Sequence, residues 1–245
     1  MADRDEFDKQ IEENIAGLRS DIDLRHLSRS WIEASAKHRY SYNFTWLGRP
    51  VIQYPQDLIA LQEIIWRTRP ELIIETGVAH GGSLIFSASL LELIGGAGKV
   101  IGIDIEIRPH NRKAIEDHPL FRRISLIEGS SIDPEVAADV SRAATGKRTM
   151  VILDSNHTHD HVLGELRAYA PLVSSGCYLI ILDTVIEDLP DALFAGRPWK
   201  QGDNPKTAVH EFLRGTDEFV IDETIQDKLL ITVAPDGFLL CVRKP

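Results

Sequence analysis

Short apolar runs alternate with longer amphipathic stretches along the chain from about residue 56 onward. The strand-like runs are rich in Ile, Leu and Val and apolar on both faces; they are 72–76, 99–103, 123–127, 149–153 and 178–182. Strands of this kind are typical of a parallel sheet that helices cover on both sides. The pattern therefore predicts an α/β fold with a doubly wound, Rossmann-like sheet.

Helical periodicity fills the intervals between these runs. Pro55 suits the first turn of a helix that continues to about Thr68, and Asp133 followed by Pro134 is a typical helix start. The other expected helices lie near 83–95, 134–143, 159–171 and 206–214.

The C-terminal segment contains three more strand-like runs, 218–222, 229–233 and 238–243. Pro235-Asp236-Gly237 is a turn signal, so residues 229–243 are predicted to form a hairpin. A mostly parallel sheet with one late antiparallel strand matches the methyltransferase variant of the doubly wound fold.

The N-terminal segment has a different character. Residues 5–38 are highly charged and predict one or two helices, whereas residues 40–55 are aromatic and irregular. We expect a helical appendage with a cap segment over 1–55, followed by one cofactor-binding domain over 56–245.

Composition narrows the function classes. A formal charge of −10 without a cluster of Lys and Arg argues against nucleic acid as a partner. No apolar run reaches the roughly 18 residues of a membrane span, and the charged N-terminus lacks the apolar region of a secretory signal. Cys177 and Cys241 lie in apolar runs and are expected to be buried free thiols in a reducing, cytoplasmic compartment.

A glycine-rich turn after the first apolar run carries the clearest functional signal. Glu75 and Gly77 end that run, Gly81-Gly82 open the next helix, and Asp104 ends the second run. A tight turn lets backbone N–H groups approach a ligand, while an acid at the next strand end can accept hydrogen bonds from ribose hydroxyls. Because three residues separate Gly77 from Gly81, the spacing differs from the dinucleotide fingerprint. The acid before the turn, the tight glycine turn and the ribose acid together favour S-adenosylmethionine over NAD.

Acids also end the later strands. Asp154 and Asp183 follow neighbouring predicted strands, and oxygen ligands suit a hard cation such as Mg²⁺, with Thr184 or Asn156 as a neutral donor. Such an ion could hold and polarise a substrate hydroxyl. The alternative is that Asp154 caps the following helix and Asp183 begins a turn.

His157 is the candidate general base, because its usual pKa lies near neutrality and it directly follows the Asp154 strand end. The run His157-Thr158-His159-Asp160-His161 also allows a His-ligated metal, as in an iron-dependent hydroxylase. The start of a helix would splay these side chains around its axis, so His159 and His161 are expected on the helix surface.

Two segments are expected to wall the pocket, the cap segment 40–55 and a long loop over 184–205. In the cap segment, Trp46 and Arg49 could stack on or hydrogen-bond a sugar-like substrate, and Lys206 follows the loop as a further substrate candidate. An alternative role for Trp46 is to dock the N-terminal appendage on the domain.

An ordered set of motifs resembles the cephalosporin hydroxylase / rhamnosyl O-methyltransferase family. The matching stretches are Trp46-x-Gly48-x-Pro50, Gln53-Tyr54-Pro55-x-Asp57, Ile74-Glu75-Thr76-Gly77-x-x-x-Gly81-Gly82-Ser83, Ile101-Gly102-Ile103-Asp104, Gly129-Ser130-Ser131, Leu153-Asp154-Ser155-Asn156-His157 and Asn204-Pro205-Lys206-Thr207-Ala208-Val209. The resemblance covers about 44–243 and implies an S-adenosylmethionine- and Mg²⁺-dependent O-methyltransferase acting on natural-product or sugar hydroxyls.

The motifs and the resemblance together assign the site. The candidate cofactor-binding residues are Glu75, Gly77, Gly81, Gly82, Ser83, Asp104, Ile105, Ser130, Ser131 and Asp154. Asp154, Asp183 and Thr184 are the metal candidates, and Asp154 and His157 are the catalytic ones, with His157 also facing the substrate. One departure concerns the metal: relatives often have Glu-Asp where this chain has Leu182-Asp183, so one acidic ligand is missing.

The predicted function is an O-methyltransferase for a hydroxyl of a sugar, a glycoside or polysaccharide precursor, or a secondary metabolite. We expect a small-molecule or saccharide acceptor as partner, and a homo-oligomer. Two alternatives remain open: a metal-dependent hydroxylase that uses the histidine run, and a non-catalytic cofactor-binding assembly protein whose N-terminal helices mediate oligomerisation.

Overall fold

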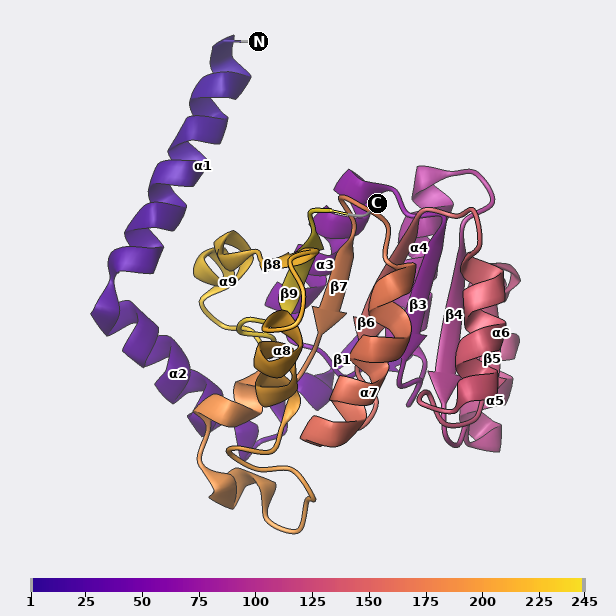
Figure 1. Cartoon of the computed structure of the whole chain (residues 1–245). Helices are drawn as coiled ribbons and strands as arrows, with labels where there is room; N and C mark the ends of the chain where they lie inside the picture. The colour runs from indigo at the N-terminus through magenta and orange to yellow at the C-terminus, as the bar shows by residue number, and fades with distance from the viewer. Residues whose placement is uncertain (1, 244–245) are drawn as a thin grey trace.

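A computed structural model describes residues 2–243, which form a seven-stranded sheet between two layers of helices (Figure 1). The strand order is β5-β4-β3-β6-β7-β9-β8. The strands are β3 (Leu72–Thr76), β4 (Lys99–Asp104), β5 (Ile124–Glu128), β6 (Thr149–Leu153), β7 (Tyr178–Ile181), β8 (Phe219–Ile221) and β9 (Phe238–Cys241). The five apolar runs predicted as parallel strands pair in parallel, which confirms the doubly wound sheet.

Within the seven-stranded sheet the single antiparallel strand is β9, which lies between β7 and β8 and is antiparallel to both. The predicted 229–243 hairpin is wrong. Residues 223–229 form a short helix, α9 (Glu223–Leu229), and 230–237 continue as irregular chain with a turn at 235–236. The apolar residues after Leu229 pack from this irregular chain, and β8 takes the place beside β9.

Each face of the sheet has its own helical layer. One core joins Ile73, Met150 and Ile180 to α3 (Pro55–Thr68) and α4 (Gly82–Ile94). The other joins the alternate strand positions to α6 (Pro134–Ala144), α7 (His159–Tyr169) and α8 (Pro205–Leu213). The helix α5 (Pro109–Glu116), which the sequence pattern did not predict, contributes Ile115 to the first core. Alternating side chains of apolar strands therefore fill both layers.

The N-terminal segment forms two helices, as predicted. Helix α1 (Ala2–Ser20) projects away from the sheet, and α2 (Ile22–Ala36) returns toward its carboxyl edge (Figure 1). Asp21 separates them and caps α2 by accepting from the Leu24 N–H. The predicted boundary at residue 55 stays a prediction.

Aromatic packing joins α2 to the body of the protein. The Trp31 ring meets Tyr40 edge-on at 4.8 Å and Tyr54 at 6.0 Å, and Ile32 is buried beside Tyr54. The tryptophan that helps to dock the N-terminal helices is thus Trp31 rather than Trp46. Trp46, in the hairpin formed by β1 (Phe44–Trp46) and β2 (Arg49–Val51), instead packs on Phe86 of α4.

Within residues 2–243, no helix combines the length and the apolar character that crossing a bilayer requires.

Candidate functional site

Two adjoining cavities lie at the carboxyl edge of the sheet, where the sequence predicted ligand binding. One, of about 320 Å³, is lined by residues of the glycine turn, the cap segment, and Asp154, His157 and Asp183. The other, of about 340 Å³, is lined by Asp104, Ile105, Ser130, Ser131, His161 and Trp199, among others. Gly77, Ala79, Asp154 and Ser155 line both cavities, so the glycine turn and the end of β6 form their common wall.

Gly77 is required by both its conformation and its surroundings. Its φ is +91°, and a Cβ atom at this position would lie 2.0 Å from the Asp154 carbonyl oxygen. The turn is fixed from the other side by Asp104, whose Oδ2 accepts from the N–H groups of Val78 at 2.8 Å and Ala79 at 3.2 Å. The carboxylate predicted to bind ribose thus also orders the glycine turn, and its Oδ1, which accepts from the Glu106 N–H at 3.3 Å, retains further acceptor capacity.

The start of α4 lies directly beneath the cap segment. A Cβ on Gly82 would lie 2.1 Å from the Pro50 carbonyl oxygen, so this glycine permits the close approach of β2. Arg49 donates from Nε and Nη2 to the His80 carbonyl oxygen, at 3.0 and 2.6 Å. The structure therefore places Arg49 against the backbone of the glycine turn and outside the lining of the two cavities.

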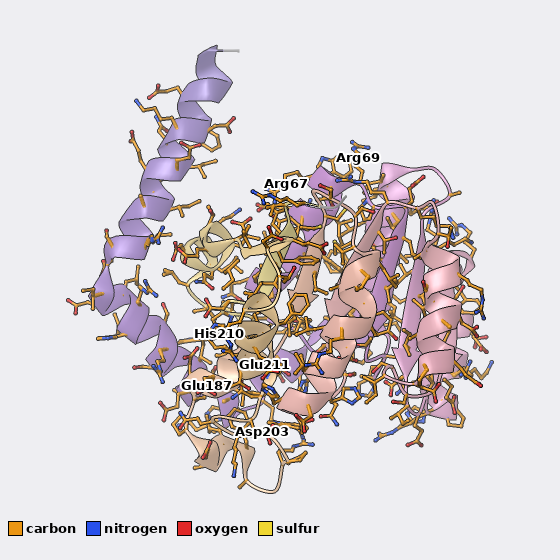
Figure 2. All side chains as sticks on the ribbon, in the orientation of Figure 1. Arg67, Arg69, Glu187, Asp203, His210 and Glu211 are labelled. Atoms are coloured by element: carbon orange, nitrogen blue, oxygen red, sulfur yellow. The ribbon has the colours of Figure 1, made fainter. Side chains whose placement is uncertain are left out.

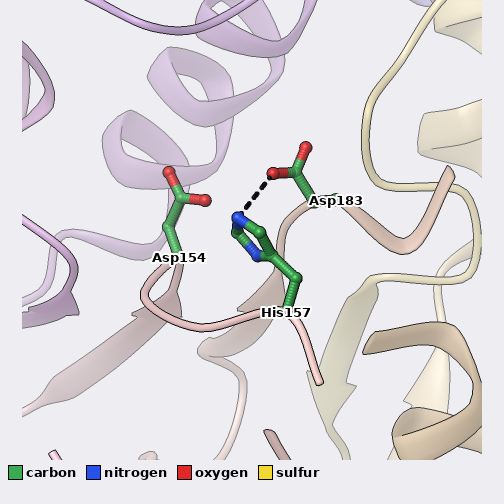
Figure 3. Close-up of side chains that lie close together, drawn as sticks. All are labelled: Asp154, His157 and Asp183. Atoms are coloured by element: carbon green, nitrogen blue, oxygen red, sulfur yellow. Dashed lines mark ion pairs between the residues drawn. The ribbon is translucent and has the colours of Figure 1, made fainter. Parts of the chain in front are cut away.

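The acids at the strand ends converge with His157. In residues 2–243, Asp154, His157 and Asp183 are the one set of three or more acid, His or Cys side chains with ligand atoms all within 4.8 Å of one another. His157 Nε2 lies 3.1 Å from Asp183 Oδ2, and the ring is placed between the two carboxylates (Figure 3). Asp183 has φ +57°, an uncommon left-handed conformation for a non-glycine residue, which is typical of functional sites.

Gln53 is a neighbour that the site prediction missed. Its Nε2 donates to Asp154 Oδ2 at 3.2 Å, whereas its buried Oε1 has no hydrogen-bond partner within the described part of the chain. The alternative role for Asp154 as a helix cap is not observed: Thr158 is the N-cap of α7, and its N–H donates to Asn156 Oδ1.

The carboxyl edge concentrates buried negative charge. Burial raises the pKa of Asp154 well above its usual range, and the nearby carboxylates of Asp183 and Glu75 raise it further. Burial also raises the pKa of Glu75 to about 7, although the Ser83 hydroxyl donates to it. A cationic ligand would relieve this repulsion and keep the carboxylates ionised.

The raised pKa of Glu75 makes stability depend on pH. The folded chain holds this proton up to about pH 7, whereas an unfolded glutamate loses it near pH 4.5. Its contribution to the free energy of unfolding therefore falls as pH rises between these values, and is constant above and below them. We expect the thermal midpoint of the ligand-free protein to rise when the pH is lowered from 8 to 6. Glu75→Gln should show a smaller rise.

The matched control is Glu106→Gln, which changes an exposed side chain. It should leave the pH dependence of the thermal midpoint unchanged. Parallel pH profiles for wild type and Glu75→Gln would contradict this assignment.

The loop predicted to wall the pocket reaches the site through Trp199. Its ring meets the His157 ring edge-on at 4.7 Å, and Trp199 also lines the second cavity. Glu187 and Asp203 hold this loop at the carboxyl edge of the sheet (Figure 2): Glu187 Oε2 accepts from the Gly202 N–H, and Asp203 Oδ1 accepts from the His159 N–H.

Three other candidates lie apart from the cluster. Trp46 donates from Nε1 to Ser89 Oγ at 3.0 Å and does not belong to the lining of either cavity. Thr184 is buried and donates to the Pro235 carbonyl oxygen at 2.6 Å. Lys206 pairs with Asp188 at 2.8 Å and lines a separate cavity beside α2. Their assigned roles stay predictions.

The expectation that His159 and His161 lie on the helix surface is wrong. The His159 ring contacts Thr207 Oγ1 at 2.8 Å and Glu211 Oε2 at 3.2 Å, whereas His161 turns into the second cavity. The metal-type cluster therefore contains one histidine of the run rather than two or three.

Comparisons with known proteins agree with this architecture. The family model described as Rhamnosyl O-methyltransferase/CmcI matches residues 38–242. A rhamnosyl O-methyltransferase of Mycobacterium bovis (strain BCG / Pasteur 1173P2) is 32% identical over 223 residues, covering 84% of each chain. One of Mycobacterium leprae (strain TN) is 30% identical over 217 residues, covering 84% of this chain and 90% of the relative. A solved structure, cmcI-D160 Mg-SAM, has the same fold, with a TM-score of 0.57 at 20% identity over 82% of this chain and 78% of that chain.

Proposed function

Because this chain belongs to the rhamnosyl O-methyltransferase/CmcI family, an O-methyltransferase family, we propose that it methylates a hydroxyl of a sugar ring. The donor is S-adenosylmethionine, and a rhamnosyl glycoside is the first acceptor to test, because the curated relatives are named rhamnosyl O-methyltransferases. The observation that carries the proposal is the pair of adjoining cavities, which meet at Gly77 and Asp154.

The second cavity suits the nucleoside part of the donor. Asp104 offers carboxylate oxygens to ribose hydroxyls, and Ile105, which is 72% exposed, offers an apolar face to the base. Ser130 and Ser131 face the same cavity from the loop after β5. Gly77 and Asp154 line both cavities, so the acidic cluster adjoins the nucleoside site and a sulfonium there would lie near negative charge.

The acidic cluster also fits a divalent cation. Asp154 and Asp183 would hold it. Their carboxylates lie close enough to repel each other, and a cation between them would remove this repulsion. When bound, Mg²⁺ supplies Lewis acidity that lowers the pKa of a coordinated hydroxyl. Leu182 offers no oxygen ligand, because its side chain is a hydrocarbon, and it is buried in the core that includes α3 and α4.

The chain's own residues perform the proton transfer. The acceptor hydroxyl enters the first cavity and gives its proton to the unprotonated ring nitrogen of His157, because Nε2 faces the Asp183 carboxylate at 3.1 Å and donates its own proton to it. Asp183 stabilises the charged imidazole through the 3.1 Å contact. Trp199 restricts the His157 ring and excludes water from the transfer. Holding the acceptor oxygen in line with the donor methyl group then accounts for much of the rate.

The direct test combines binding and product mass. Isothermal titration should detect binding of S-adenosylhomocysteine, and a panel of rhamnosyl glycosides incubated with S-adenosylmethionine should yield a product one methylene heavier. Absence of cofactor binding would overturn the proposal. Binding without transfer to any sugar acceptor would favour the assembly-protein alternative.

Metal dependence is a separate prediction. We expect a chelator to lower turnover at least about tenfold and Mg²⁺ to restore it, because the two carboxylates otherwise repel each other and the acceptor alkoxide. Asp183→Asn should require more Mg²⁺ for half-maximal turnover. Asp160→Asn, which changes an exposed acid in the first turn of α7, is the control and should titrate like wild type. Full turnover in chelator would contradict a metal role.

A further inference from the structure

A hydrogen-bonded network of four side chains forms part of the wall of the second cavity. Ser131 comes from the loop after β5, Ser155 from the loop after β6, and His161 and Glu165 from α7. Both serine hydroxyls donate to Glu165 Oε1, at 2.6 and 2.7 Å. His161 Nε2 lies 3.1 Å from Ser131 Oγ and 3.2 Å from Ser155 Oγ.

This network is buried on one side and open on the other. Glu165 has no exposed surface, and its Oε2 has no hydrogen-bond partner among residues 2–243. Ser131 is held from behind, because Tyr169 Oη donates to its carbonyl oxygen at 2.6 Å. His161, one helical turn before Glu165, keeps 19% of its side chain exposed and lines the cavity.

The direction of the hydrogen bonds fixes the histidine tautomer. An ionised Glu165 can only accept, so each serine spends its one proton on Oε1. The serine oxygens can then only accept from His161, which requires a proton on Nε2. In the neutral ring, Nδ1 therefore carries a lone pair. None of the hydrogen bonds found between described residues involves Nδ1, which leaves it free to accept from a ligand in the cavity.

We infer that His161 reads the exocyclic amino group of the donor's adenine, which rests on the proposed function and names the residue that selects the base. Adenine presents an N–H donor at its 6-position, which suits an acceptor nitrogen. Hypoxanthine presents a carbonyl oxygen there, so two lone pairs would face each other without a proton between them. Ile105 provides an apolar face in the same cavity and does not distinguish the two bases.

The experiment compares two ligands by titration calorimetry on the full chain. S-adenosylhomocysteine should bind wild type roughly 10–100-fold more tightly than S-inosylhomocysteine, the range expected when a buried acceptor loses its donor. His161→Leu should bring the ratio of the two dissociation constants close to one. His161→Gln keeps a donor for the serines and an acceptor for the base, so it should retain most of the preference.

His159→Leu is the matched control on the same helix, because His159 faces Thr207 and Glu211 rather than the cavity. It should keep the wild-type ratio. If His161 had a merely structural role, His161→Leu would weaken the binding of both ligands equally. The ratio of their dissociation constants would then stay as in wild type, and that result would overturn the inference. Failure of wild type to bind either ligand would instead overturn the proposed function.

A second measurement does not depend on the folding of any variant. Nitrogen-15 NMR of wild type should find the His161 proton on Nε2 in the free protein and a shift of Nδ1 when S-adenosylhomocysteine is added. A proton on Nδ1 in place of Nε2, or no response of Nδ1 to the ligand, would also overturn the inference.

Discussion

Replacing His157 with alanine is expected to lower methyl transfer by about 10²–10⁴-fold, the usual contribution of a positioned general base. His157 Nε2 lies beside Asp183 in the cavity where the acceptor is proposed to bind. The loss should appear in kcat, because the imidazole acts on the acceptor proton in the transition state. The measurement is product formation with a rhamnosyl acceptor, followed by mass spectrometry.

The cofactor should still bind this variant. His157 lines the first cavity but not the second, where the nucleoside is proposed to lie, so the dissociation constant of S-adenosylhomocysteine should stay within about threefold of wild type. His159→Ala, a histidine-to-alanine change two residues away, is the control and should retain turnover. Retained activity in His157→Ala would remove the base from this mechanism, and loss of cofactor binding would point to a collapsed loop around Trp199.

The strands could be predicted because their environment is uniform. Every residue of β3 and β6 is buried, so an apolar run that needs no alternation identifies them. The run 229–233 is similarly apolar but does not form a strand. Buried Asp57 accepts from the Thr232 hydroxyl and from the Val233 N–H at 3.0 Å, which satisfies this segment without a strand partner. A contact between residues so far apart in the chain leaves no local signal.

The topology of the sheet explains which parts of the site could be predicted. Asp104, Asp154 and Asp183 end strands of one parallel sheet, so topology alone places them at one edge. Gln53 lies 101 residues before Asp154 in sequence, and only the packing of the cap segment brings its amide to that carboxylate.

The pairing of His161 with Glu165 at the second cavity was missed for a related reason. Their spacing of four residues indicates one face of a helix, but it does not say which face of α7 turns toward Ser131 and Ser155. A histidine four residues before a glutamate, in the first turn of the helix that follows a strand-end acid, is a signal that could have found the pair.

Replacing Gly77 with alanine is expected to abolish measurable cofactor binding, a loss of more than about 100-fold, because the new Cβ meets fixed backbone. The Asp154 carbonyl oxygen would lie 2.0 Å away. Neither partner can easily move, since the Gly77 N–H donates to Ile103 at 2.7 Å and the Asp154 N–H donates to Thr76 at 2.9 Å. The turn must then open between the two cavities, which removes the wall that both ligands share.

Gly146→Ala separates this collision from the general cost of a left-handed alanine. Gly146 has φ +71°, and a Cβ atom at this position would meet no other atom within 4 Å, so the substitution carries the conformational cost alone. That cost is about 1–2 kcal/mol, or roughly 2–8 °C in thermal midpoint for a chain of this size, with cofactor affinity unchanged. Titration of S-adenosylhomocysteine into both folded variants decides the matter: equal, small effects at the two positions would mean that the contact between Gly77 and Asp154 does not shape the cofactor site.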